Sequence, residues 1–130
     1  MDRTSNWMAL PEELRPQNYD IQHISLQETE QLFNKAEKLG VLDIFAEMFW
    51  DTMELAKRSK ASLQEAVNLL EEQKRLIGRQ YDKMPSKTFV SQARKHYVGV
   101  KYNEIEHQIR WMVSTFNLNR TSKPYLLEVK

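Results

Sequence analysis

Proline is absent from a long interior stretch of this 130-residue chain, and its absence there limits the possible folds more than any other feature. The prolines fall at positions 11, 16, 85 and 124, so residues 17–84 lack the residue that breaks helices most strongly. Apolar residues recur through this stretch at spacings of three and four, the period of an amphipathic helix. We therefore expect an all-α fold, a compact bundle of about five helices in a single domain over residues 1–130.

The segment 25–80 is predicted to form a scaffold of three helices. Ser25 and Glu28 make a capping box, in which each side chain satisfies a backbone N–H of the first turn. The helix that they begin is expected over residues 26–39. Gly40 supplies its stop, because glycine readily adopts the left-handed conformation that ends a helix.

The second and third helices of this scaffold differ in how much of their surface is apolar. Apolar residues cover most of the circumference of the second helix, over residues 41–60, so this helix is expected to be central. Ser62 and Glu65 form a second capping box ahead of the third helix. The apolar stripe of the third helix is interrupted by Lys74, and the helix is expected to end near Gly78.

A pair of short helices is predicted in the segment 86–118, after a linker that contains Pro85. The first helix is expected over residues 88–97 and the second over residues 103–117, with Gly99 in the break between them. Asn103 and the glutamate three residues later repeat the capping-box pattern. Two short helices joined by a glycine-containing turn have the outline of a helix-turn-helix.

The two ends of the chain are predicted to be partly extended. Residues 1–24 form an N-terminal arm and residues 119–130 a C-terminal tail. Within them, residues 21–24 and 125–129 have the composition of strands and could pair with each other.

Charge is unevenly distributed along the chain. The formal net charge is only +1, yet residues 1–60 hold 7 basic and 11 acidic residues, whereas residues 86–130 hold 8 basic and 3 acidic residues. An acidic part joined to a basic part is typical of a protein that binds a polyanion. The alternative is an ordinary surface of solvated lysines.

The basic segment contains the candidate nucleic-acid contacts. Asn103, His107 and Arg110 share the outward face of the second short helix and can hydrogen-bond base edges or phosphates. Basic side chains flank them as candidate backbone contacts. The full predicted set is Lys87, Arg94, Lys95, Lys101, Asn103, His107 and Arg110. Two glutamates at the start of this helix, Glu104 and Glu106, count against the interpretation because they would repel phosphates.

The apolar helix over residues 41–60 is the candidate protein interface. A helix this apolar must be surrounded, either in the domain core or partly against a second subunit or another protein. The residues that distinguish these alternatives are Phe45, Met48, Phe49, Trp50 and Met53. Exposure of Trp50 and Met53 would favour a partner.

Several classes of function lack support in the sequence. The chain has no cysteine, which excludes thiol catalysis and cysteine-ligated metals, and its three glycines cannot make a phosphate-binding loop. Glu104 and His107 have the spacing of one di-iron motif, but a metal site would need several more ligands. We therefore expect no enzyme activity, metal or small-molecule cofactor. The chain lacks a signal peptide and an apolar span, which predicts a soluble cytoplasmic protein without membrane contact.

Two functions remain open on these grounds. The first is a small regulatory protein that binds DNA through the basic helical pair and forms a homo-oligomer through the apolar helix. The second is an adaptor or assembly component without nucleic-acid binding, whose basic third docks on an acidic protein partner. In that case the tail over residues 125–129 could add a strand to a partner's sheet.

Overall fold

The computed structural model describes residues 9–128, and within them the protein is all-helical. It contains four α-helices, namely α1 (Leu26–Lys38), α2 (Leu42–Ala56), α3 (Lys60–Lys83) and α4 (Phe89–Phe116), preceded by two 3-10 turns at Glu12–Leu14 and Pro16–Asn18. The all-α prediction is confirmed. No strand is present among the described residues, so the predicted pairing of residues 21–24 with residues 125–128 does not form. Val129 lies outside the described residues.

The first helix begins and ends where its local signals predict. The Ser25 side chain accepts a hydrogen bond from the Glu28 backbone N–H at 3.1 Å, and α1 ends at Lys38, one residue short of the expected position. Gly40 follows with a φ of 73°, in the left-handed region. Helix α2 then begins at Leu42 and ends at Ala56.

Helix α3 differs from the prediction at both ends. Ser59 rather than Ser62 caps it, accepting a hydrogen bond from the Ser62 backbone N–H, and the helix continues through Gly78 to Lys83. A Cβ at position 78 would lie 3.1 Å from the ring of Tyr102 on α4. Gly78 therefore permits a close helix–helix approach instead of ending the helix.

The largest correction concerns α4. One continuous helix, Phe89–Phe116, replaces the two short helices and the break predicted around Gly99, so no helix-turn-helix exists in this segment. Glycine within a helix costs only about 1 kcal/mol relative to alanine, and the packing of α4 along α3 outweighs that cost. Asn103 and Glu106 consequently lie inside the helix and not at its start. Thr88 and Ser91 provide the capping box of α4.

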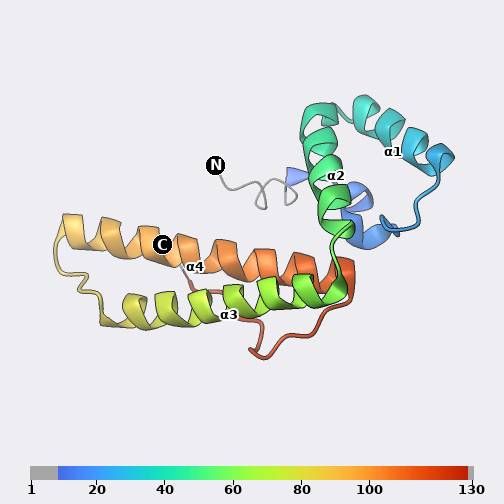
Figure 1. Cartoon of the computed structure of the whole chain (residues 1–130). Coiled ribbons are helices and arrows are strands. Elements are labelled where there is room, and N and C mark those ends of the chain that lie inside the picture. The colour runs from blue at the N-terminus through green and yellow to red at the C-terminus, as the bar shows by residue number, and fades with distance from the viewer. Residues whose placement is uncertain (1–8, 129–130) are drawn as a thin grey trace.

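The four helices form two units of different length. Helices α3 and α4 run antiparallel as a long hairpin, and α1 and α2 pack at the end where α3 begins and α4 finishes (Figure 1). The opposite end, where residues 84–88 join the two long helices, projects away from α1 and α2 (Figure 1). Within residues 9–128, none of the helices combines the length and the apolarity that crossing a bilayer requires.

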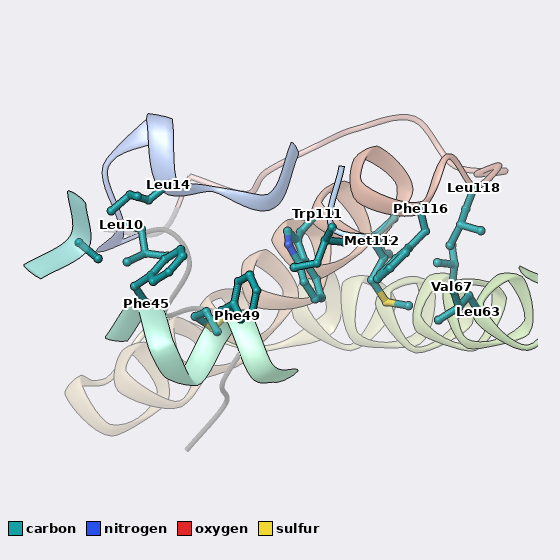
Figure 2. Packing of buried hydrophobic residues seen from close by; sticks show 14 residues of the cluster. Leu10, Leu14, Phe45, Phe49, Leu63, Val67, Trp111, Met112, Phe116 and Leu118 are labelled. Atoms are coloured by element: carbon teal, nitrogen blue, oxygen red, sulfur yellow. The ribbon is translucent and has the colours of Figure 1, made fainter. Parts of the chain in front are cut away.

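The hydrophobic core joins the two units. It runs from Leu14 and Phe45 past Phe49 to Trp111 and the base of the hairpin (Figure 2). Phe33 packs edge-on against both Phe45 and Phe49, with ring centroids 5.1 and 5.3 Å apart. These ring contacts join α1 to α2, and the core continues from α2 to Trp111 at the base of the hairpin. The far end of the hairpin is therefore left without cover from these helices.

The predicted interface residues of α2 divide between the core and the surface. Phe45, Met48 and Phe49 are buried in the core, and Met53 is partly buried against it. Trp50 is 60% exposed although its ring contacts that of Phe49. Most of the predicted interface is therefore domain core, and Trp50 alone is available at the surface.

Candidate functional site

Four of the predicted nucleic-acid contacts lie on the outer half of the hairpin. Lys87, Arg94 and Lys101 are exposed there. Lys95 is partly buried, with its Nζ 4.7 Å from the ring centroid of Tyr81 on α3. These cations surround the end of the molecule that projects away from α1 and α2.

The other three predicted contacts lie in the half of α4 nearer to α2, and two of them hydrogen-bond within the chain, Asn103 to the C-terminal segment and Arg110 to a residue one turn earlier in α4. Asn103 donates from Nδ2 to the Leu127 carbonyl at 2.9 Å and accepts from the Leu127 N–H at 2.8 Å. Arg110 Nε donates to Glu106 at 2.6 Å. Burial, followed by the charge of Arg110, lowers the pKa of the partly buried His107. The seven residues thus do not form one reading surface.

The outer end of the hairpin, which we call the tip and define as residues 79–101, exposes large apolar side chains among its charges. Phe89 is 85% exposed, and Val90 and Tyr97 are also exposed. They line a shallow groove of about 520 Å³ together with Gln80, Met84, Ala93, Arg94 and Val98. The tip contains six basic residues, Arg79, Lys83, Lys87, Arg94, Lys95 and Lys101, and one acidic residue, Asp82. It is therefore both apolar and strongly basic.

A second hollow, which we call the inner pocket, lies between α2, α3 and α4. Its volume is about 480 Å³, and its lining includes Trp111 together with Asp51 and Glu54 of α2. The rest of the lining is formed by Met48, Leu55, Arg58, Ala66, Leu69, Leu70, Gln73, Gln108 and Met112. The indole N–H of Trp111 is buried without a hydrogen-bond partner. The pocket is mainly apolar, and its charged lining residues are Asp51 and Glu54 of α2 and Arg58 just after that helix.

The tip groove and the inner pocket open on the same side of the hairpin. Helix α3 contributes Gln73 to the inner pocket and Gln80 to the groove. Residues seven apart lie two turns along one helix face, about 10 Å from each other. Leu76, between them in sequence, is exposed. We call this surface, from the tip groove to the inner pocket, the open face.

The hairpin also carries a buried ionic network, which the sequence analysis missed. Glu106 is fully buried and Lys74 is 4% exposed, and Lys74 Nζ donates to Glu106 Oε1 at 2.9 Å. Arg120, from the segment after α4, makes a bidentate contact with the same carboxylate at 2.8 and 3.1 Å. Arg110 is the third cation on Glu106. The network joins α3, α4 and the C-terminal segment.

A second carboxylate fixes the same segment to α3. Glu71 accepts hydrogen bonds from the backbone N–H groups of Thr121 and Ser122 and from both hydroxyls. Burial alone would raise the pKa of Glu71, but these hydrogen bonds outweigh it and hold the pKa at about 2. Burial likewise acts to raise the pKa of Glu106, and hydrogen bonds from Arg120, Lys74 and Arg110 hold it at about 2. Both groups are ionised at neutral pH.

Two side-chain amides clasp the backbone of the C-terminal segment at its ends. Gln64 donates to the Asn119 carbonyl at 2.7 Å and accepts from the Asn119 N–H at 2.8 Å. Asn103 does the same at Leu127. Each amide satisfies one N–H and one carbonyl, as a neighbouring strand would. Residues 119–127 are thus held against the hairpin by side chains, without forming a strand.

Neither a metal centre nor a known relative assigns a chemistry to this arrangement. Among residues 9–128, no group of three or more His, Asp or Glu side chains is placed to hold a metal ion, and Glu104 and His107 gain no further ligands. Comparison of the chain with protein-family models, curated proteins and solved structures found no match. The tip and the open face are therefore the candidate site on geometry alone.

Proposed function

We propose that this protein is a non-enzymatic adaptor whose hairpin tip binds an acidic surface of a partner protein. The observation that carries this proposal is the exposure of Phe89, Val90 and Tyr97 on one groove, which Arg94 also lines. Exposed apolar side chains that cluster together are typical of interaction sites. Burying each of these three against a partner would contribute about 1.5–3 kcal/mol.

The charge of the tip supports the choice of an acidic partner. Lys87 and Arg94 are exposed beside the apolar groove, and the tip as a whole has six basic residues against one acidic residue. A basic rim around an apolar centre accelerates association with acidic surfaces and disfavours basic ones.

The buried charges give no support to an enzymatic alternative. A general acid or base works best with a pKa near the operating pH, whereas the pKa values of Glu71 and Glu106 are about 2. Their oxygens accept hydrogen bonds from neighbouring side chains and backbone, which suits a structural role.

Nucleic acid is the second candidate ligand, and the excess positive charge of the tip favours it. Exposed Phe89 and Tyr97 beside lysines and arginines could stack on unpaired bases. This candidate predicts binding that weakens steeply with added salt and with Arg94→Ala. Fluorescence anisotropy of labelled duplex and single-stranded DNA measures both effects. Absence of binding at low salt would remove the candidate.

Site-specific photo-cross-linking tests the adaptor proposal. A photoreactive amino acid at position 90 should give protein adducts in cells, and Arg94→Glu should diminish them. Position 26 is the matched control, because Leu26 is 78% exposed and also lies in the first turn of a helix, but on α1. Equal adduct yields at positions 90 and 26 would contradict the proposal.

A further inference from the structure

The open face joins two hollows of opposite charge. At one end Arg94 lines the tip groove, within a tip that holds six basic residues and one acidic residue. At the other end the charged residues of the inner pocket are Asp51, Glu54 and Arg58, an excess of one negative charge, and Lys57 Nζ lies 3.4 Å from Glu54 at the surface. The charged residues within α2 are all acidic, namely Asp43, Glu47, Asp51 and Glu54, and the basic residues Lys57 and Arg58 follow the helix. One surface thus carries a basic patch and an acidic patch, and each can attract the oppositely charged patch of another molecule.

Both hollows also expose apolar surface that one chain does not bury. Phe89 and Tyr97 are exposed at the tip, and Leu69 is exposed at the inner pocket. Leu76 continues this surface between them. An apolar strip along two helices is the kind of surface that completes a helical bundle when a second pair of helices packs on it.

We infer that the open face binds the open face of a second copy of this chain, in antiparallel orientation. This inference rests on the proposed function, because it names the acidic partner of the tip. The tip of one copy would pack into the inner pocket of the other, and the reverse contact would form at the opposite end. Arg94 of each copy would then face Glu54 of the partner subunit.

The distribution of charge favours the antiparallel orientation of the two copies over the parallel one. A parallel arrangement would place the two basic tips together and the two acidic ends together, which repels at both ends. The antiparallel arrangement pairs a basic tip with an acidic pocket twice. Its two-fold axis passes near Leu76, which lies between the two hollows, so the contact is self-complementary and closes as a dimer without extending to a filament.

The inner pocket is large enough to accept one aromatic side chain of the tip. Its volume of about 480 Å³ is within the range of roughly 300–1,000 Å³ typical of small-molecule sites, which exceeds what one aromatic side chain occupies. Phe89, the first residue of α4, is the most exposed large apolar side chain of the described residues. It is the tip residue that we expect to enter the pocket.

A charge exchange between two variants of the full chain tests the inference. Wild-type protein should show twice the chain mass of 15.5 kDa by light scattering, with dissociation on dilution. Arg94→Glu or Glu54→Lys alone should weaken the dimer by at least roughly tenfold, since each places two pairs of like charges in the contact. An equimolar mixture of the two variants should dimerise again, because every contact in the mixed dimer joins opposite charges.

Arg75→Glu is the control for net charge, since Arg75 is exposed on α3 but lines neither hollow. It should leave the dimer unchanged, and circular dichroism should show equal helicity for all variants. Failure of the mixture to dimerise would overturn the antiparallel contact. A wild-type mass of one chain at every concentration would overturn the second copy as partner. In that case, position-specific adducts of other proteins at residue 90 would still support the adaptor proposal.

Discussion

At the residue scale, the most consequential side chains are the charges buried between α3 and α4. Lys74 and Glu106 face each other across the hairpin, and Arg120 closes the network from the C-terminal segment. The sequence contained a signal for it, because Lys74 interrupts an otherwise apolar stripe. The partner could not be identified, since Glu106 looked like a capping residue and Arg120 is distant in sequence. Lys74 and Glu106 are buried because of the way α3 and α4 align in the hairpin, and this alignment cannot be read from the sequence.

Removing the central carboxylate should be costly. Glu106→Gln removes the anion that the buried Lys74 contacts and leaves Arg120 only the more distant Glu71, at 3.7 Å, and breaking such a network costs about 3–5 kcal/mol of unfolding free energy. Urea denaturation measures this change. Glu72→Gln is the control, because the Glu72–Arg75 pair is exposed to solvent and its loss should leave the free energy of unfolding almost unchanged. Equal losses in the two variants would contradict the structural role of the network.

The network should also make the free energy of unfolding depend on pH in the acidic range. The pKa of both Glu71 and Glu106 is lowered from 4.5 to about 2 in the folded protein. Groups with a lowered folded pKa stabilise the protein above their unfolded pKa, and this stabilisation is lost as the pH falls from about 5 towards 2. Carbon-detected NMR titration of the glutamate carboxylates measures the two values directly. Titration of both groups near 4.5 would refute the lowered pKa values.

At the element scale, local signals predicted helix α1 well and α4 poorly. Ser25, Glu28 and Gly40 act within a few residues, so their effect on α1 is independent of the rest of the fold. Gly78 and Gly99 resembled breaks of the same kind, but α3 and α4 support each other along their length and continue through both glycines. A contact such as that of Gly78 with Tyr102 is not visible in sequence spacing.

The C-terminal segment should be held at its two ends independently. Asn103→Ala removes the clasp at Leu127, and the net loss of about 1 kcal/mol per hydrogen bond should accelerate amide exchange of Leu127 by roughly tenfold or more. The Asn119 amide, which is bound by Gln64, should be unaffected. Gln64→Ala should produce the reverse pattern. Simultaneous acceleration at both amides in either variant would show that the segment is released as one unit.

At the scale of the whole molecule, the separation of charge along the sequence becomes a separation in space. The acidic α2 and the basic tip lie at opposite ends of the hairpin (Figure 1). Composition predicted this polarity, and it identified Lys87 and Arg94 as surface cations. It could not distinguish them from Arg110, which binds Glu106, because that distinction depends on which side of α4 meets the rest of the chain.

The proposed function requires the apolar residues of the tip to serve binding and not folding. The double variant Phe89→Ser/Tyr97→Ser, with the photoreactive amino acid at position 90, tests it in one protein. Because both side chains are exposed, the free energy of unfolding should change by less than about 0.5 kcal/mol, while adducts at position 90 should be lost. Phe49→Ala, in the core, should cost about 3–5 kcal/mol in the same assay. A double variant that loses several kcal/mol, or that keeps its adducts, would contradict the claim.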